Sequence, residues 1–302
     1  MKTSAALFFF ALSMLSSPVQ VGQNRALKDD LGYSFQMSSP PQRIVSLAPN
    51  ITEILFALDL GNKVVGVTRF CDYPPQALLK EKVGGMVDPS LEKIKFLNPD
   101  LIIAFRGNPI RMLTRLKSLG FPVFIFETGS DLESLFLMIE RVGLLTQKTT
   151  EAHSLVTALR QRSEAIQAVL QSVTLRPRVF LSLHGLGLWT CGKESYLNDL
   201  IRKAKGENVA GAIPKKWLRY NREQLVRDNP DVIIVLAKSQ ADYQTARDWL
   251  VKEADLRDLK AVRRGEIRFL DENLASRYGP RLVEALGQLA GLLHSRHIGE
   301  ER

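Results

Sequence analysis

Apolar and polar residues follow two different periods along this chain. Short apolar runs, such as 101–105 and 232–236, are typical of strands that are buried on both faces of a sheet. Segments with apolar residues at helical spacing lie between these runs. From Gln147 to about Val173 the chain contains no Gly or Pro and keeps helical spacing, which predicts a single helix about 40 Å long. The pattern therefore predicts an α/β fold of two parallel-sheet sandwich lobes joined by one long α-helix.

The same pattern divides the chain into five segments. We predict a signal peptide at 1–22, a polar leader at 23–41, an N-terminal lobe at 42–145, the linking helix at 146–174 and a C-terminal lobe at 175–302. The signal peptide is predicted because Lys2 precedes a short apolar run at 5–15, which is not long enough to cross a bilayer as a helix. Export to the periplasm follows from this prediction. An uncleaved anchor or a buried helix is the alternative.

Two segments far apart in the chain, 91–103 and 222–234, have closely similar sequences. In each copy a glutamate, Glu92 or Glu223, opens a short amphipathic helix, and a proline seven residues later ends that helix before an apolar strand. A repeat of this length is too long for a solenoid and indicates two similar lobes that face each other across a cleft. Such a protein can hold a small molecule between its lobes and present two matched carboxylates to another molecule.

One helix start is predicted from a capping sequence. Asn50 followed three residues later by Glu53 forms a candidate capping box directly before an apolar segment. In such a box the short polar side chain accepts a hydrogen bond from a backbone N–H of the first turn. We therefore expect Asn50 to be the N-cap of the first helix.

Charge and motifs exclude several function classes. The net charge is +9, but the basic residues are scattered and no basic motif interleaved with aromatic residues is present, so a solvated basic surface is favoured over nucleic-acid binding. There is no Gly-x-Ser-x-Gly motif and no phosphate-binding Gly-x-x-x-x-Gly-Lys motif, and Gly185-x-Gly187 lacks a third glycine. We therefore expect neither an enzyme nor a resident cofactor.

Cysteine and histidine residues offer few metal ligands. Cys71 and Cys191 fall in different predicted lobes, and we favour two free, partly buried thiols over a disulfide between the lobes. His184 could ligate haem iron or cobalt, but a cleft histidine without a metal bond is the favoured interpretation. The histidines are not clustered, so a bare metal ion is not the expected cargo.

Three strings together resemble a known protein family. They are 43–53, which reads RIVSLAPNITE, then 71–75, CDYPP, and then 91–94, LEKI. This combination is similar to the periplasmic substrate-binding proteins of the cobalamin, siderophore and haem importers, over about residues 42–295. The resemblance implies a monomer that captures a small molecule between two lobes and delivers it to an ABC importer. The nearest pattern is that of the cobalamin-binding members, through 103–108, 192–195 and Trp217 followed by 221–224.

The resemblance implies a cargo and the residues that contact it. Cobalamin or a related corrinoid is the implied ligand, with a ferric siderophore or haem as the alternative and a secreted α/β hydrolase as a remote one. Broad aromatic faces suit a largely apolar macrocycle. Core packing is the alternative for each apolar residue, and a surface salt bridge for the arginine. The residues that match the family's ligand contacts are Phe70, Met86, Phe105, Trp189, Trp217 and Arg277.

Several of these positions depart from the cobalamin pattern. Phe70 stands where that pattern has a tyrosine, and Met86 and Phe105 stand where it has tryptophans. Asn273 replaces an acidic residue near Arg277. The changes remove a polar contact and make the cleft wall less bulky. For a siderophore or haem, the arginines that would meet anionic groups are Arg69, Arg106, Arg219 and Arg277.

Glu92 and Glu223 match the two glutamates by which this family docks onto arginines of the two permease subunits. On physical grounds too, paired carboxylates at matching helix starts guide association and fix its register. The alternative is that each glutamate only stabilises the N-terminus of its own helix. We expect docking to a permease dimer because the two residues occupy the same position in the repeat.

Overall fold

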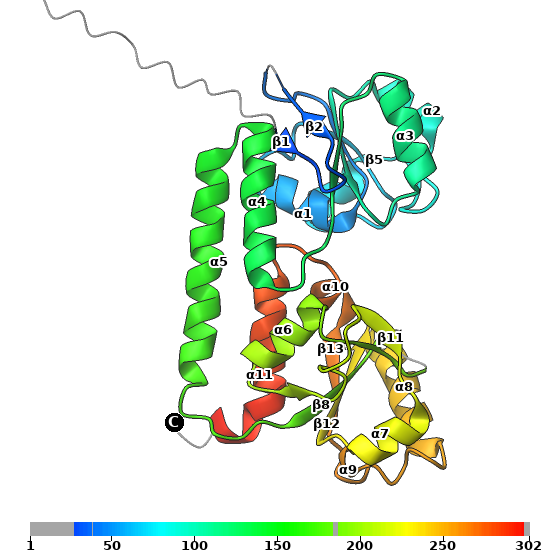
Figure 1. The fold of residues 1–302 in the computed structure, drawn as a ribbon, viewed down its shortest axis with the longest axis vertical. Coiled ribbons are helices and arrows are strands. Elements are labelled where there is room, and N and C mark those ends of the chain that lie inside the picture. Colours follow the sequence, from blue (N-terminus) through cyan, green and yellow to red (C-terminus); the bar gives the residue numbers. More distant parts are fainter. Residues whose placement is uncertain (1–26, 38, 184–186, 299–302) are drawn as a thin grey trace, which may run out of the picture.

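The computed structural model describes residues 27–37, 39–183 and 187–298, without the side chains of 295–298. The predicted signal peptide, the first part of the predicted leader and His184 lie outside these residues. Two lobes follow each other along the long axis of the molecule, and long helices run along one side of them (Figure 1).

The N-terminal lobe is built on a parallel five-stranded sheet in the order β5-β4-β3-β6-β7. Its central strands are buried on both faces, as expected from their continuous apolar sequence. A small hairpin of β1 (Leu27–Lys28) and β2 (Ser34–Phe35) precedes the sheet. The strands are β3 Ile44–Ser46, β4 Val64–Val67, β5 Glu81–Lys82, β6 Leu101–Phe105 and β7 Val123–Phe126. The helices are α1 Pro49–Ala57, the 3-10 helix η1 Pro75–Leu79, α2 Leu91–Leu97, α3 Ile110–Ser118 and α4 Leu132–Thr146.

The C-terminal lobe is built on a parallel four-stranded sheet in the order β10-β8-β12-β13. A separate antiparallel pair, β9 (Trp189–Cys191) and β11 (Trp217–Arg219), lies at its edge toward the other lobe (Figure 1). The strands of the main sheet are β8 Arg178–Ser182, β10 Glu207–Asn208, β12 Val232–Ala237 and β13 Ile267–Asp271. The helices are α6 Tyr196–Lys203, α7 Arg222–Asp228, α8 Gln240–Lys252, α9 Lys260–Arg263, α10 Glu272–Ala275 and α11 Leu282–Ile298.

The linking helix is α5, Thr149–Val169, which runs along both lobes (Figure 1). It packs against α4, which precedes it, and against α11, which ends the C-terminal lobe. Its 21 residues give a length of about 30 Å, shorter than predicted, because Gln147 is the C-cap of α4, so that α5 begins only at Thr149, and because α5 ends at Val169 rather than at about Val173. The predicted fold class, two parallel-sheet lobes joined by a long helix, is confirmed.

One apolar core runs through both lobes. Its buried side chains come from both sheets and from the helices along them, and include Ile103, Ile139, Ile234 and Leu289. Two further apolar clusters cover the opposite faces of the two sheets. Because the shared core is continuous, separating the lobes would expose apolar surface to water, and we expect only limited lobe movement.

The internal repeat extends to the way each short helix is built. α2 begins after Ser90, whose hydroxyl accepts a hydrogen bond from a first-turn N–H, and α7 begins after Asn221, whose amide oxygen does the same. Each helix ends at an asparagine in the left-handed conformation, Asn98 (φ 43°) or Asn229 (φ 41°). Asparagine adopts this conformation more readily than most residues, which is why the same residue recurs there.

Each repeat is also tied to the first strand of its own lobe. Arg43, just before β3, donates to the last carbonyl of α2, and Arg178, in β8, donates to the last carbonyl of α7. Asp100 accepts a hydrogen bond from Arg43 N (2.9 Å), and Asp231 accepts one from Arg178 N (2.9 Å). The two glutamate-bearing helices are therefore fixed to their lobes in the same way.

The predicted N-cap of the first helix is wrong. Pro49 occupies the first position of α1, where its missing N–H costs nothing, and Ala48 is the N-cap. Asn50 consequently lies inside the helix, and its side chain donates to Tyr278 O of the other lobe (3.3 Å). Glu53 is likewise directed to the other lobe.

Candidate ligand cleft and docking surface

The two parallel sheets face each other through their carboxyl ends. Asn50, which follows β3, reaches the segment after β13, where Tyr278 lies. Arg277 in that segment forms an ion pair with Glu53 of α1 (3.3 Å). Loops at the carboxyl ends of parallel strands are the usual place for ligand sites in α/β folds. A ligand held between the lobes would therefore contact these two sets of loops.

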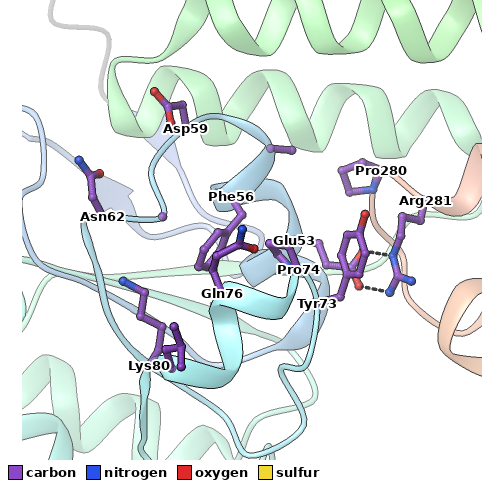
Figure 2. Close-up of a pocket in the computed structure, with 13 residues that line it drawn as sticks. Glu53, Phe56, Asp59, Asn62, Tyr73, Pro74, Gln76, Lys80, Pro280 and Arg281 are labelled. Carbon is purple, nitrogen blue, oxygen red and sulfur yellow. Dashed lines mark hydrogen bonds and ion pairs between the residues drawn. The ribbon is translucent and has the colours of Figure 1, made fainter.

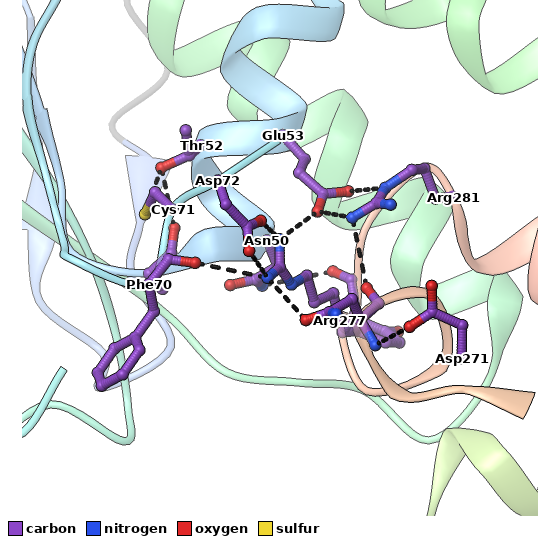
Figure 3. Close-up of polar contacts among 12 residues, drawn as sticks. Asn50, Thr52, Glu53, Phe70, Cys71, Asp72, Asp271, Arg277 and Arg281 are labelled. Atoms are coloured by element: carbon purple, nitrogen blue, oxygen red, sulfur yellow. Dashed lines mark hydrogen bonds and ion pairs between the residues drawn. The ribbon is translucent and has the colours of Figure 1, made fainter. Parts of the chain in front are cut away.

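The N-terminal lobe places three of the predicted ligand contacts at this end of its sheet. Phe70 follows β4 and is 48% exposed, while Phe105, the last residue of β6, and Met86, in the loop after β5, are partly buried. The Phe70 ring points away from the ion pairs at the lobe junction (Figure 3). Its centroid lies 5.0 Å from the guanidinium carbon of Arg69. Phe70 thus presents a large apolar surface outside the core.

Asn108 connects two of these segments, a role that sequence analysis missed. Its side chain is 3% exposed, and its Nδ2 donates to Met86 O (2.8 Å) and to Leu47 O (3.0 Å). Its Oδ1 accepts a hydrogen bond from Phe105 N (2.8 Å). The side chain therefore fixes the backbone at Met86 and Phe105. An asparagine shortly after a buried strand was the only sequence signal for it.

The C-terminal lobe contributes the two tryptophans. Trp189 and Trp217 begin the paired strands β9 and β11 and are 46% and 41% exposed. The ring of Trp217 meets that of Tyr196 edge-on at 5.8 Å, and the ring of Tyr196 lies 5.0 Å from that of Tyr278. Tyr278 Oη donates to Asp131 O of the other lobe (2.8 Å). Buried aromatic rings thus support Trp217 from the lobe junction, while much of the indole remains exposed.

An ion-pair network joins the lobes at this junction (Figure 3). The side chain of Glu53 is 2% exposed and accepts hydrogen bonds from Arg281 (2.6 and 3.0 Å) and from Arg277 (3.3 Å). Arg277 also donates two hydrogen bonds to the carboxylate of Asp72, and these lower the pKa of Asp72. Both arginines belong to the C-terminal lobe and both carboxylates to the N-terminal lobe, so the network holds the lobes together.

The role of Arg277 in ligand binding stays a prediction. In this structure its side chain is 12% exposed and its guanidinium faces carboxylates of the other lobe. Asn273, which replaces the family's acidic residue, accepts a further hydrogen bond from Arg277 (3.2 Å). The carboxylates paired with Arg277 therefore come from across the junction, from Glu53 and Asp72. Sequence analysis did not assign this role to Glu53 and Asp72.

We expect Glu53→Gln to destabilise the folded chain by about 3 kcal/mol. The substitution leaves the partly buried Arg281 without its only carboxylate partner among the described residues and removes one of the two from Arg277. Urea unfolding of the variant checks this value. Glu133→Gln is the matched control, because its ion pair with Arg160 is exposed and contributes under about 1 kcal/mol. If Glu53→Gln and Glu133→Gln had the same free energy of unfolding, the network would not stabilise the contact between the lobes.

The two repeated glutamates lie on the surface of different lobes. Glu92 is in the first turn of α2 and Glu223 in the first turn of α7, and both are exposed. Both helices are on the side of the molecule remote from α5 (Figure 1). Within the described part of the chain neither carboxylate has an ion-pair partner; Glu92 accepts a hydrogen bond from Ser90 Oγ (3.2 Å). Both are therefore available to cations of another molecule.

The two cysteines are free, as favoured, but both are fully buried rather than partly buried. Cys71 Sγ lies 3.1 Å from the hydroxyl oxygens of Thr52 and Thr68. Burial raises the pKa of both thiols, that of Cys191 to about 12. Over residues 27–37, 39–183 and 187–298 no group of three or more His, Cys, Asp or Glu side chains could hold a metal ion. No helix among these residues is long and apolar enough to cross a membrane.

A cavity of about 740 Å³ lies beside α1 (Figure 2). α1, η1 and the segment around Arg281 surround it, and Phe56, Tyr73 and Lys80 are among its lining residues. None of the six predicted ligand contacts lines it. The cavity reaches the lobe junction at Glu53 and Arg281 but is separate from the six predicted ligand contacts.

Comparison with known proteins places the chain among binding proteins. A profile of the periplasmic binding protein family matches residues 44–274. An uncharacterised ABC transporter substrate-binding lipoprotein of Bacillus subtilis, YvrC, is 30% identical over 271 residues, which cover 87% of this chain and 83% of that protein.

Solved structures agree with this placement. The periplasmic vitamin B12-binding protein of Vibrio cholerae is 30% identical, with a TM-score of 0.71 over 84% of this chain and 97% of that one. The periplasmic heme-binding protein RhuT of Roseiflexus sp. RS-1, in its apo form, is 28% identical, with a TM-score of 0.76 over 84% of this chain and 98% of that one. The fold is thus shared by proteins with different cargoes.

Proposed function

Because this chain belongs to the periplasmic binding protein family and is an ABC transporter substrate-binding protein rather than an enzyme, we propose that it captures cobalamin or a related corrinoid between its lobes. It then delivers this cargo to an ABC importer. It acts outside the cytoplasm, as its periplasmic and lipoprotein relatives do. Export to the periplasm by the predicted signal peptide is part of the proposal.

The exposed aromatic side chains carry the proposal. Phe70 of one lobe, in the loop after β4, and Trp189 and Trp217 of the other, at the starts of β9 and β11, are between 41% and 48% exposed. Broad aromatic faces on both sides suit a wide, flat and largely apolar macrocycle, because each ring buries a large area with little loss of conformational entropy. Phe105 and Met86, fixed by Asn108, extend the apolar wall.

Charge favours a corrinoid over haem or a ferric siderophore. The carboxylates of haem and of many siderophores need cations that are free to bind them. Three of the four candidate arginines are instead bound to carboxylates of this chain. A corrinoid carries mainly neutral amides at its edge and does not require them. The three pairs are Arg69 with Asp88, Arg106 with Glu127 and Arg277 with Asp72.

Glu92 and Glu223 are the proposed contacts to the permease. Two exposed carboxylates without ion-pair partners in the described chain, one on each lobe and both remote from α5, match a partner built from two similar subunits with a cation on each. Matching side-chain contacts hold each helix to its own lobe, and the shared apolar core limits movement between the lobes. The protein is proposed to dock as a monomer.

A thermal-shift series tests the cargo. We expect cyanocobalamin to raise the melting temperature, because a ligand at a hundredfold excess over its dissociation constant stabilises the folded state by about 2.7 kcal/mol. Haem and a ferric siderophore at the same excess are the competing ligands in the series. A larger shift with either would assign the cargo to that class instead, and no shift with any of the three would contradict the proposed site.

A further inference from the structure

α2, the helix that carries Glu92, exposes a large apolar side chain one turn further along. Phe96 is 89% exposed, whereas Ile94 of the same helix is fully buried. Because residues four apart share a helix face, Phe96 lies beside Glu92. At this exposure the Phe96 ring adds little to the packing of α2, so the stability of the lobe does not account for it.

α7 exposes a similar set of side chains, but in a different order along the helix. Three and four residues after the glutamate, α2 has Lys95 and Phe96, whereas α7 has Val226 and Arg227. All four side chains are exposed, Val226 to 44%. Each helix thus presents a glutamate, an apolar side chain and a cation within one turn. Because the two helices themselves are at matching places of the repeat, the same three kinds of side chain on both argue that both surfaces serve one purpose.

We propose that Phe96 is an apolar anchor of the permease interface and that it enters an apolar recess beside the cation that pairs with Glu92. The inference rests on the proposed docking role of Glu92 and Glu223. The partner is a permease subunit, because the unpaired carboxylate calls for a cation and the neighbouring ring calls for an apolar recess about one helical turn away. Buried aromatic anchors dominate the affinity of interfaces, whereas exposed ion pairs contribute little. Phe96 therefore sets most of the affinity, and its lobe binds more strongly than the lobe with the smaller Val226.

The test measures binding of the full-length mature protein to its importer in lipid nanodiscs, at low and at high salt. We expect Phe96→Ala to weaken binding by about ten- to a hundredfold at both salt concentrations, because an apolar contact is not screened. Glu92→Gln should weaken binding at low salt and less at high salt. Leu144→Ala is the matched control: Leu144 is 50% exposed on α4, the helix that packs against α5, and its removal should leave the affinity unchanged.

The outcomes separate this inference from the docking proposal. If the Glu92→Gln/Glu223→Gln double variant is weakened while Phe96→Ala binds as the wild type does, the anchor is overturned and the docking proposal stands. If the double variant binds as the wild type does, the docking proposal is overturned, and the inference about Phe96, which rests on it, is overturned with it. Because the Phe96 side chain is so exposed, we expect Phe96→Ala to have the melting temperature of the wild type. Weaker binding by this variant then reflects the lost contact and not a loss of stability.

Discussion

Changing both Glu92 and Glu223 to lysine is expected to abolish cargo uptake while leaving the affinity for the cargo unchanged. The two carboxylates are exposed, lie on separate lobes and have no ion-pair partner in the described chain. A lysine at each position would face the permease cation that the glutamate is proposed to contact. Like charges at an interface cost several kcal/mol and also slow the encounter. Uptake by reconstituted importer and cargo binding by calorimetry are the two measurements.

The two single lysine variants and a charge reversal elsewhere on the surface are the controls for this result. Each single lysine variant should lose part of the uptake, since one lobe still docks. Glu164→Lys, on the exposed face of α5, changes the surface charge away from both helices and should transport normally. If the double variant lost cargo affinity as well, the glutamates would support the fold or the cleft rather than docking.

Trp217→Ala is expected to weaken corrinoid binding by about ten- to a hundredfold. Trp217 is 41% exposed and is supported by Tyr196, so its indole is a rigid apolar surface that a flat ligand can cover. Trp217→Phe should keep part of the affinity because a smaller aromatic face remains. Equilibrium titration with cyanocobalamin gives the dissociation constants.

The third tryptophan provides the control for that variant. Trp249 lies on α8, where the guanidinium carbon of Arg222 is 5.8 Å from its ring, and it packs against the core of the C-terminal lobe. Trp249→Phe should leave corrinoid affinity unchanged. If Trp217→Ala bound cyanocobalamin with the affinity of the wild type, Trp217 would not contact the ligand, and the proposed aromatic site would be contradicted.

The lobes and the linking helix could be predicted because their signals are local. An apolar strand that is buried on both faces must be continuous, and a helix without Gly or Pro keeps its period, so each is visible within a short window. The repeated helices were equally visible, and their ends at Asn98 and Asn229 follow the same rule in both lobes. The length of α5 was overestimated because the helix begins after Gln147 and ends at Val169, and no Gly or Pro marks either end in the sequence.

The contacts at the lobe junction could not be predicted in the same way. Glu53 and Arg281 are 228 positions apart, and no local pattern marks either as the partner of the other. The sequence around Glu53 also fits a capping box. The structure has no such box because Pro49 occupies the first helical position, which places the N-cap at Ala48. Asn108 connects three backbone segments through one side chain, and only the folded arrangement of those segments shows it.

A crystal structure of the protein grown with cyanocobalamin would show where the corrinoid binds. We expect the corrin ring to lie between the lobes, with Trp189 and Trp217 on one side and Phe70 on the other. A corrin ring bound elsewhere, for example in the cavity beside Phe56 and Tyr73, would contradict the proposed site.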